Sequence, residues 1–289
     1  MKKVIWGILM NILYLFPREI AHKILYRIVM KKKLNLDNPY DLNEKIQWLL
    51  LNRYGENEAF LADKYLVKKF LTEKGYGKYI PKLYAVYDNV YDINLDTLPE
   101  KFVLKTNNGC GNVFVCKDKN SFNLNKAKKV LNTALKKNFA KVNLEYHYSL
   151  IKPKILCEEF LDDGTEKLPT DYKFYCFNGK VECVLVCTDR IDENNKTIAY
   201  YDRNWKRLAF ESEEYVSSKN IEKPENFEEM LSLASNLSVG HNFVRVDLYN
   251  LNGKIYFGEL TFTPACGMIY SLKQESLDYL GSYINIGDK

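Results

Sequence analysis

Hydrophobic and polar residues alternate most regularly near the end of the chain, over residues 243–261. Residues 243–249 and 254–261 each have the period-two pattern of a half-buried strand, and the Asn-Leu-Asn-Gly between them is typical of a hairpin turn. Side chains two residues apart share one face of a strand, so Arg245 lies beside Asp247 and Glu259 beside Thr261. The pattern therefore predicts a hairpin on which two carboxylates, a guanidinium and a hydroxyl converge.

The remaining periodicities divide the chain into an N-terminal part rich in helices and a later part rich in strands. Apolar residues at helical spacing predict helices over residues 41–54, 58–74 and 125–138, and one that begins at 224. Short apolar or alternating runs predict strands over residues 80–87, 102–106, 113–116, 154–161, 172–177, 181–188 and 198–201. Helices that precede and follow an antiparallel sheet indicate an α+β fold.

The first 33 residues have a pattern of their own. Residues 4–16 are apolar apart from a glycine and an asparagine, and after Pro17 isoleucines recur at helical spacing. This arm carries eight Lys or Arg and one Glu, a net charge of +7, whereas the whole chain carries +5 and the remainder therefore −2. A basic amphipathic helix is typical of an anionic membrane surface, and the alternative is that the arm packs on protein. The nearly neutral remainder argues against nucleic acid as a partner.

Several polar residues on the predicted strands are candidates for binding a phosphorylated ligand. Lys105 precedes the glycine-containing loop 107–111, where backbone amides can approach a phosphate closely. Glu158 and Glu159 are adjacent on a strand and so face opposite ways, which leaves either of them to meet a ribose. Lys173 on the next strand could reach a phosphate. Each feature also has an ordinary structural explanation: a glycine-rich turn, a solvated edge-strand glutamate and an exposed lysine.

Two further sets of residues say less about function. Arg190, Tyr201 and Asp202 surround a predicted loop and could hold a carboxylate or a sugar, although ordinary packing explains them equally well. The seven cysteines have no metal-ligand spacing and the chain has only three histidines, so neither a zinc site nor a histidine-based triad is supported. Scattered thiols of this kind are typical of a reduced, cytosolic protein.

The order of these segments resembles the ATP-grasp superfamily and, more closely, the TupA-like ATP-grasp proteins of teichuronopeptide biosynthesis. The segments that carry the resemblance are Asn38–Trp48, Asp63–Lys64, Phe102–Lys105, the Glu158-Glu159 pair, Asp171–Phe174, Tyr201–Trp205, Arg245–Asp247 and Gly258–Phe262. The resemblance covers roughly residues 38–275, and the first 33 residues lie outside it.

The resemblance implies an ATP-grasp fold, of the α+β class, with a small mobile lid subdomain and a catalytic subdomain built on an antiparallel sheet. It divides the chain into the basic arm (1–37), a helical N-terminal subdomain (38–100), the lid (101–165) and the catalytic subdomain (166–289).

The resemblance also implies roles for individual residues. The cofactor-binding set would be Lys64, Lys105 and Lys173 on the phosphates of ATP, Asn108, Gly109 and Gly111 in a mobile loop over them, and Glu158 or Glu159 on the adenosine. The metal set would be Asp247, Glu259 and Thr261 on Mg²⁺. The catalytic set would be Arg245, which stabilises the transferred phosphoryl group, with Lys105 and Lys173. The superfamily usually has Asn where Thr261 stands, which leaves the number of metal ions open.

The activity that the resemblance implies is an ATP- and Mg²⁺-dependent ligase that forms a C–N bond. ATP would convert a carboxylate into an acyl phosphate, which an amine then attacks. The expected substrates are a uronic acid of a cell-surface polysaccharide or its precursor, and an amino acid. A glycosyltransferase, an ATP-dependent glycan kinase on the same scaffold and a nucleotide-binding scaffold without turnover are the alternatives. The expected location is cytoplasmic, peripheral on the inner face of the membrane through residues 1–33.

Overall fold

The structure is a computed structural model, and it describes residues 2–109, 111–162, 164, 168–190, 197–216 and 219–287. The chain forms two compact units. Unit 1 consists of residues 1–54 and 162–289, and unit 2 consists of residues 55–161. Each unit has its own antiparallel sheet.

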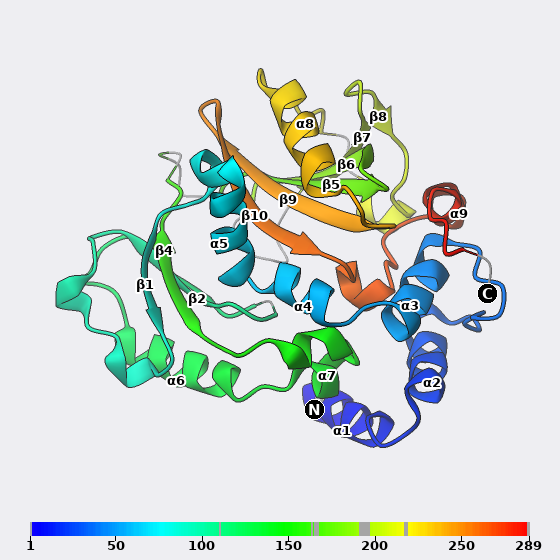
Figure 1. The fold of residues 1–289 in the computed structure, drawn as a ribbon, viewed down its shortest axis with the longest axis horizontal. Helices are drawn as coiled ribbons and strands as arrows, with labels where there is room; N and C mark the ends of the chain where they lie inside the picture. Colours follow the sequence, from blue (N-terminus) through cyan, green and yellow to red (C-terminus); the bar gives the residue numbers. More distant parts are fainter. Residues whose placement is uncertain are drawn as a thin grey trace. The chain divides into compact units, whose positions relative to one another are not determined.

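Unit 1 is built on a six-stranded sheet with the strand order β10-β9-β5-β6-β7-β8 (Figure 1). Its strands are β5 (Asp171–Phe177), β6 (Lys180–Thr188), β7 (Thr197–Asp202), β8 (Arg207–Leu208), β9 (Val244–Leu251) and β10 (Lys254–Thr261). Its helices are α1 (Lys2–Leu13), α2 (Arg18–Met30), α3 (Leu42–Asn52), α8 (Phe227–Leu237) and α9 (Gln274–Ser282), with short turns η6 (Glu213–Tyr215) and η7 (Pro264–Gly267). Helix α8 covers one face of the sheet, where Phe227 stacks on Phe174.

The C-terminal hairpin forms as its alternating pattern predicts. Asn252 and Gly253 both have positive φ angles, 50° and 80°, which is the backbone of a tight two-residue hairpin turn. The strand register places Glu259 opposite Asp247 and Thr261 opposite Arg245, after a bulge between Phe257 and Glu259. At the bulge only glycine fits, because a Cβ on Gly258 would lie 2.9 Å from the carbonyl oxygen of Asp247.

Helix α3 begins with the capping signal that its sequence predicts. The carboxylate of Asp41 accepts a hydrogen bond from the backbone amide of Glu44 at 2.9 Å. Helix α9 packs against this end so closely that a Cβ on Gly281 would lie 2.6 Å from the backbone nitrogen of Leu42. The ammonium of Lys45 adds hydrogen bonds to the carbonyl oxygens of Gly281 and Ile284, at 2.9 Å each. Residues far apart in the sequence are thereby joined within unit 1.

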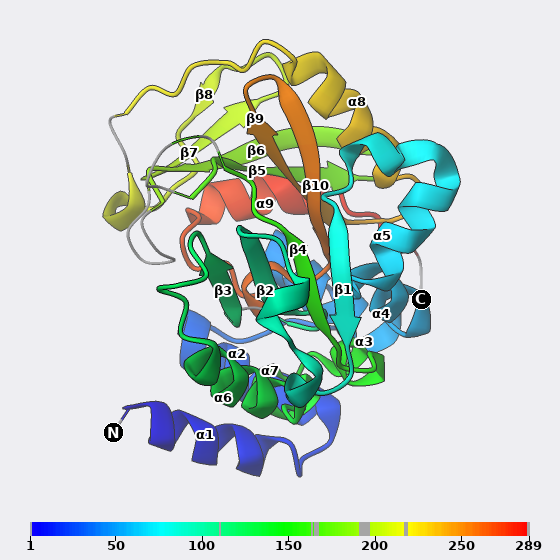
Figure 2. The ribbon, with the colours of Figure 1, turned by 90° about the vertical axis from the view of Figure 1, so that its left-hand side faces the viewer.

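Unit 2 contains a four-stranded sheet with the order β1-β4-β2-β3. Its strands are β1 (Leu83–Tyr87), β2 (Phe102–Thr106), β3 (Val113–Cys116) and β4 (Ile155–Glu159). Its helices are α4 (Glu56–Ala62), α5 (Leu66–Leu71), α6 (Leu124–Leu135) and α7 (Phe139–Asn143), with single turns η1 (Thr72–Tyr76), η2 (Gly77–Tyr79), η3 (Val90–Asp92), η4 (Leu95–Thr97) and η5 (Tyr146–Leu150). Helix α6 lies next to this sheet (Figure 2). Phe102, Leu104 and Cys157 on the sheet share a buried core with Ala127 and Leu131 of α6.

The prediction of one helix over residues 58–74 is wrong, because the chain forms two helices there. Helix α4 ends at Ala62 and α5 begins at Leu66. At the break Asp63 is extended, and its carboxylate accepts hydrogen bonds from the amides of Tyr65 and Leu66 at 2.8 and 3.2 Å. The amide of Lys64 donates to the carbonyl oxygen of Asn107 at 3.1 Å, so the break is held by a distant loop that the local pattern does not contain.

The two units also differ from the four expected segments. Strand β1 pairs along β4, with Leu83 opposite Glu158 and Tyr87 opposite Ile155, so residues 55–100 belong to one unit with the expected lid. Helix α3 belongs instead to unit 1 with the strands of residues 162–289. Pairing between distant strands therefore decides the division into these two units, and the four expected subdomains stay a prediction.

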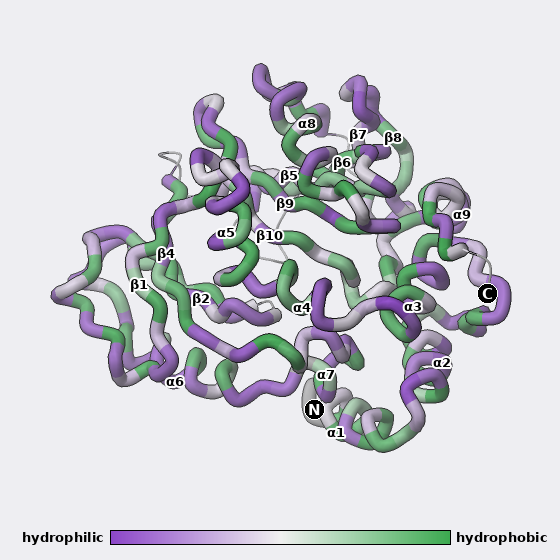
Figure 3. Tube along the Cα trace, viewed as in Figure 1, coloured by the Kyte–Doolittle hydropathy of each residue, from purple (hydrophilic) through white to green (hydrophobic). Residues whose placement is uncertain are grey.

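The N-terminal arm forms two helices joined at Pro17. Helix α2 buries Ala21, Leu25 and Tyr26, and it exposes Ile20 and Ile28. Hydrophobic residues also run along α1 (Figure 3). Within the described residues, no helix has both the length and the apolar character needed to span a membrane.

Candidate functional site

The first candidate group lies on three neighbouring strands of unit 1. Lys173 of β5 is opposite Asp247 of β9, which is opposite Glu259 of β10. Arg245 lies two residues before Asp247 and is opposite Thr261. Because side chains alternate along each strand, this register places all five side chains on one face, the one that α8 does not cover.

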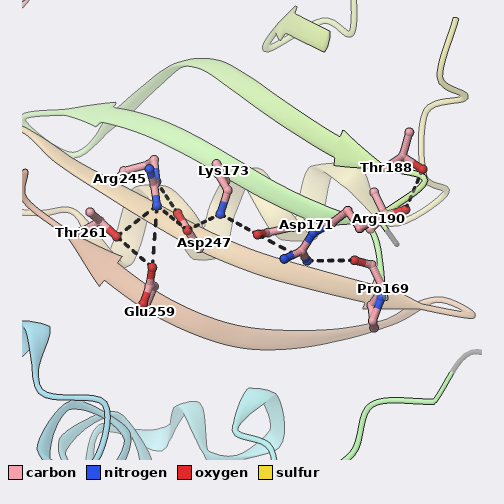
Figure 4. Close-up of polar contacts among 10 residues, drawn as sticks. Pro169, Asp171, Lys173, Thr188, Arg190, Arg245, Asp247, Glu259 and Thr261 are labelled. Atoms are coloured by element: carbon pink, nitrogen blue, oxygen red, sulfur yellow. Dashed lines mark hydrogen bonds and ion pairs between the residues drawn. The ribbon is translucent and has the colours of Figure 1, made fainter. Parts of the chain in front are cut away.

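Hydrogen bonds and ion pairs join this group into one network (Figure 4). The guanidinium of Arg245 donates to both oxygens of Asp247, from Nε and from Nη2, at 2.7 Å each. Nη2 also donates to Thr261 Oγ1 at 3.2 Å and lies 3.7 Å from Glu259 Oε1. Thr261 Oγ1 in turn donates to Glu259 Oε1 at 3.3 Å. The structure thus brings together Arg245, Asp247, Glu259 and Thr261, as the alternation of the two strands predicts.

Lys173 extends the network toward the other end of β5. Its ammonium donates to Asp247 Oδ2 at 2.6 Å and to Asp171 Oδ2 at 2.5 Å. Arg190 Nη1 lies 3.6 Å from the same Asp171 oxygen and donates to the carbonyl oxygen of Pro169 at 3.2 Å. The second oxygen of Asp171, Oδ1, is buried and has no hydrogen-bond partner among the residues that the structure describes. Asp171 is therefore a carboxylate with spare accepting capacity in the middle of the network.

Burial and pairing shift the pKa values of this group in opposing ways. Burial lowers the pKa of Lys173, but Asp171 and Asp247 overcome it and raise that pKa well above its usual range. Burial raises the pKa of Asp247 against the opposing effect of Arg245 and Lys173. The pairing therefore favours the charged form of Lys173, whereas burial opposes the charged form of Asp247. Because its oxygens accept three charge-assisted hydrogen bonds, we take Asp247 to be ionised.

The donor atoms of this group fit a hard divalent cation such as Mg²⁺. Asp247, Glu259 and Thr261 offer only oxygen, and Mg²⁺ is usually bound by one or two carboxylates together with substrate phosphates. Glu259 is the most accessible acid, with its side chain 29% exposed, whereas that of Asp247 is 3% exposed. In the described part of the chain no cluster of three His, Cys, Asp or Glu side chains is placed to hold a metal ion. The fit therefore depends on added phosphate or water ligands.

The second candidate group lies in unit 2 and is centred on Glu158 of β4. Glu158 Oε1 pairs with Lys68 Nζ of α5 at 2.6 Å, and Oε2 pairs with Lys105 Nζ of β2 at 2.7 Å. The Glu158 side chain is 3% exposed. Burial opposes its ionisation, but the two lysines lower the pKa of Glu158 to about 2. Burial lowers the pKa of Lys68 to about 8. The attraction of Glu158 opposes this shift, and the like charge of Lys105 adds to it.

The two adjacent glutamates are separated by the alternation of β4. Glu158 lies on the face that carries Lys105, whereas Glu159 lies on the opposite face, with Cys157 and Phe102. Glu159 Oε2 accepts a hydrogen bond from the backbone amide of Lys82 at 3.2 Å. Of the two, Glu158 is thus the one that shares a face with the candidate phosphate-binding lysine.

The glycine-containing loop is connected to the break between α4 and α5. Lys64 Nζ donates to the carbonyl oxygen of Gly109 at 2.8 Å. Gly109 and Gly111 have positive φ angles of 69° and 80°, and Cys110 between them lies outside the described residues. Asn108 is buried, and within the described part of the chain its side-chain oxygen has no hydrogen-bond partner. Lys64, Asn108 and the two glycines are therefore close in the fold, which their separation in the sequence does not show.

Tyr201 and Asp202 are not brought together with Arg190. Tyr201 stacks on Trp205, which packs edge-on against Phe227 of α8, so Tyr201 lies on the covered face of the sheet. The carboxylate of Asp202 caps the following turn by accepting hydrogen bonds from the amides of Asn204 and Lys206, each at 2.8 Å. Both residues have structural partners of their own.

Sequence reasoning missed two members of these groups. Lys68 is a buried lysine that completes the pairing of Glu158, and its only signal is the spacing of four residues from Lys64, which also suits an exposed helix. Asp171 is a buried carboxylate that anchors both Lys173 and Arg190. Its signal was its spacing of two residues from Lys173, which places both side chains on one face of β5.

Comparison with protein families matches residues 44–285 to the model of the TupA-like ATP-grasp family. No curated protein matches the chain. Among solved structures, the chain is similar to the D-alanine–D-alanine ligase of Bacillus anthracis complexed with ATP, with 19% identity and a TM-score of 0.46 over 85% of this chain and 66% of that one. An L-amino acid ligase of Bacillus licheniformis gives 14% identity and a TM-score of 0.44 over 87% of this chain and 54% of that one. The chain spans less than two thirds of either ligase.

Proposed function

The chain belongs to the TupA-like ATP-grasp family, and from that membership we propose that it is an ATP- and Mg²⁺-dependent ligase that joins an amine to a carboxylate. The observation that carries the proposal is the group on β9 and β10. Asp247, Glu259 and Thr261 offer oxygen donors on one face, and Arg245 is bonded to two of them. Charges placed in this way suit the transfer of a phosphoryl group.

Within unit 1 we assign Mg²⁺ to Asp247 and Glu259, with Thr261 as a third ligand or as a partner of a metal-bound water. Held by these residues, Mg²⁺ would offset the negative charge that develops on the phosphate oxygens. Lys173 contacts both Asp247, at 2.6 Å, and Asp171, at 2.5 Å. An oxygen of Asp247 can therefore turn to the metal ion, because Lys173 would still be paired with Asp171. Asp171 Oδ1, to which no described residue donates a hydrogen bond, supplies a further acceptor for that ammonium. Arg245 remains to stabilise the transferred phosphoryl group.

Within unit 2 we propose that Lys64 and Lys105 bind the phosphates of the nucleotide. The loop of Asn108, Gly109 and Gly111 would cover these phosphates. Glu158 pairs with Lys105 at 2.7 Å and so orients this lysine. We also propose that one glutamate of the Glu158–Glu159 pair contacts the adenosine. Two lysines share one buried carboxylate here, which leaves an excess positive charge that favours an anionic ligand.

The reaction that we propose has two steps. The carboxylate oxygen attacks the γ-phosphorus of ATP, so that an acyl phosphate forms and ADP leaves. The amine then attacks the acyl carbon, which forms the amide and releases phosphate and a proton. From the family resemblance we propose that the carboxylate is a uronic acid of a cell-surface polysaccharide or its precursor, and that the amine belongs to an amino acid.

ADP release tests this proposal. The protein with Mg-ATP is offered pairs of a uronic acid or uronic-acid oligosaccharide and an amino acid, and each substrate alone. We expect the wild type to release more ADP than there is enzyme only when the uronic acid and the amino acid are both present. Glu259→Gln should not release ADP beyond the amount of enzyme with any pair. Hydroxylamine, which traps acyl phosphates, should convert the carboxylate to a hydroxamate. Tight ATP binding without ADP from any pair would contradict the ligase.

The same experiment separates the alternatives. A phosphorylated product that survives hydroxylamine would identify a kinase that transfers the phosphoryl group to a hydroxyl. Stabilisation against heat by nucleotide sugars rather than by Mg-ATP would favour a glycosyltransferase. Full biological function of Glu259→Gln would favour a scaffold without turnover.

We also propose that the protein binds an anionic membrane surface through its N-terminal arm. The expectation placed the membrane helix after Pro17, but α2 buries Ala21, Leu25 and Tyr26 against the protein. Most of the arm's exposed apolar side chains lie on α1 and the residues after it, although α2 also exposes Ile20 and Ile28. Those on α1 and the residues after it are Ile5, Trp6, Ile8, Ile12, Tyr14, Leu15 and Phe16. With a net charge of +7 over residues 1–33, this surface suits anionic lipid better than a second copy with the same charge.

Liposome sedimentation tests the membrane surface. Leu15, 83% exposed, is changed to Glu, and the matched control is Val239→Glu, at an apolar residue of unit 1 that is 68% exposed but lies outside the arm. We expect only Leu15→Glu to release the protein from phosphatidylglycerol vesicles, and neither change to affect ATP binding. Removal of residues 1–16 should act like Leu15→Glu, whereas removal of residues 1–33 would also expose the surface that α2 covers. Equal sedimentation of both variants would contradict the proposal.

A further inference from the structure

We infer that Gln47 of α3 is a positioning residue for the end of β10, because its amide holds the left-handed turn η7 that follows the strand, and that His22 of α2 sets the orientation of this amide. Gln47 belongs to the segment Asn38–Trp48, which the family resemblance includes without giving it a role. The Mg²⁺ readout of this role rests on the proposed function, whereas the hydrogen-exchange readout does not.

The end of β10 needs support beyond its own hydrogen-bonded ladder. In the sheet formed by the described residues, strand β10 is at the edge and pairs with β9 alone. Glu259 and Thr261 follow the bulge at Gly258, so they lie beyond the point where the register shifts. A one-sided ladder that is interrupted by a bulge leaves the outer end of the strand dependent on whatever follows it.

The turn that follows β10 has an unusual backbone. Ala265, Cys266 and Gly267 have successive φ angles of 50°, 57° and 68°. Residues with a Cβ rarely adopt this left-handed conformation, so neighbouring contacts must hold it. The chain between the strand and the turn is buried: Phe262 packs edge-on against Tyr54, with 5.6 Å between the ring centroids. A shift of the turn would therefore be transmitted to Thr261 rather than absorbed by a loose linker.

Helix α3 supplies the contacts that hold the turn. The side-chain amide of Gln47 donates from Nε2 to the carbonyl oxygens of Cys266 and Gly267, at 2.7 and 3.1 Å. Asn43, one turn earlier, accepts a hydrogen bond from the amide of Ile269 at 2.9 Å. The fit is tight, because a Cβ on Gly267 would lie 2.8 Å from Gln47 Nε2. Two side chains of one helix thus hold both the turn and its exit.

His22 determines which way the Gln47 amide faces. Both side chains are buried, and His22 Nδ1 lies 2.6 Å from Gln47 Oε1. The end of the amide that faces two carbonyl oxygens must be the NH₂, since only it can donate. The opposite end is then the oxygen, so His22 donates to it from a protonated Nδ1. The chain His22–Gln47–turn 265–267 therefore joins the second helix of the arm to the segment that follows the candidate metal ligands.

The test compares two variants of α3. Gln47→Met keeps the length of the side chain and removes the amide, whereas the matched control Lys45→Met removes two hydrogen bonds from the same helix to Gly281 and Ile284, away from the turn. The readouts are the Mg²⁺ concentration for half-maximal ADP release and the hydrogen exchange of residues 262–269. We expect a rise of about tenfold in that concentration, typical of losing an outer partner of a metal site, together with faster exchange, in Gln47→Met only. Equal effects of both variants, or none, would overturn the positioning role.

Variants of His22 give an independent check. His22→Asn retains an amide donor for Gln47, whereas His22→Phe has none. We expect His22→Asn to behave like the wild type, and His22→Phe to move the Mg²⁺ dependence in the same direction as Gln47→Met. If the wild type releases no ADP with any substrate pair, the proposed function fails. Hydrogen exchange at residues 262–269 still decides the positioning role, which is overturned if Gln47→Met and Lys45→Met exchange alike.

Discussion

The two buried groups of charges, one in each unit, differ in their balance. In unit 2 the carboxylate of Glu158 is shared by the ammoniums of Lys68 and Lys105. In unit 1 three acids and three bases form a continuous network. They are Asp171, Asp247 and Glu259, with Lys173, Arg190 and Arg245. The first group thus has an excess positive charge, whereas the second is neutral.

This difference indicates two ways of preparing a site for a ligand. An excess cation in a buried place is costly until an anion arrives, as the lowered pKa of Lys68, about 8, shows. A balanced network is already satisfied, so a metal ion must take the place of an internal partner. Lys173 makes this possible in unit 1, because it bridges two carboxylates and can keep one of them. The first group is therefore suited to binding a phosphate. The second is suited to binding a metal ion that replaces a lysine or arginine as the partner of a carboxylate.

The largest expected effect is on the stability of unit 2. Glu158→Gln leaves two ammoniums without their carboxylate, and breaking a buried pair in this way costs about 3–5 kcal/mol. We expect the lower end, because Lys105 is 19% exposed and water can reach it. Hydrogen exchange in β2 and β4, which reports on unit 2 alone, measures the loss. The control is Asp88→Asn, whose exposed carboxylate pairs with Lys154 at the surface, so its loss should change the stability of unit 2 far less. Similar losses in both variants would remove the distinction between the two groups.

The next effect separates activity from stability in unit 1. Glu259 is partly exposed and lies 3.7 Å from Arg245, so Glu259→Gln should change the free energy of unfolding by less than about 1 kcal/mol. As a proposed metal ligand it should nevertheless lower the rate of ADP release by about 100-fold or more. Asp247→Asn should lower both the rate of ADP release and the stability of unit 1, because Arg245 and Lys173 would then face a neutral amide in place of a carboxylate. A Glu259→Gln protein with normal turnover would show that the exposed acid holds no metal.

The smallest effect, over the range from pH 6 to pH 3 in which it is measured, is the pH dependence that Glu158 confers. Its pKa is lowered from 4.5 to about 2 in the folded protein, so its contribution is fully present above pH 4.5 and is lost as the pH falls toward 2. The full loss amounts to about 3 kcal/mol, and roughly half of it should be reached by pH 3. His147, whose burial lowers its pKa to about 4, contributes a separate loss between pH 6.5 and 4 in any variant that retains it.

Comparison with Glu158→Gln isolates this term. Hydrogen exchange in β2 and β4 at pH 6, 4.5 and 3 should give a steeper loss between the last two values in the wild type than in the variant. Parallel pH dependences would mean that Glu158 has the same pKa in the folded and unfolded states.

Local signals in the sequence were sufficient for most elements and for one of the two groups. The alternation of residues 243–261 and the turn at Asn252 and Gly253 set the hairpin, and with it the meeting of Arg245 and Asp247 with Glu259 and Thr261. Sequence reasoning failed where distant contacts decided the outcome. The helix expected over residues 58–74 is broken at Asp63, next to the hydrogen bond that joins Lys64 to Asn107. Lys68 could not be told from an exposed helical lysine.

The sequence by itself determined which side chains share a face of one strand or hairpin, because that depends only on the two-residue period of the backbone. The tertiary structure alone decided which charges meet across elements. Lys173 pairs with Asp247 across 74 residues, and Lys68 with Glu158 across 90. These pairs depend on the order and register of strands and on burial, which non-local packing sets. The charge balance of each group is thus a property of the fold, even though every member is visible in the sequence.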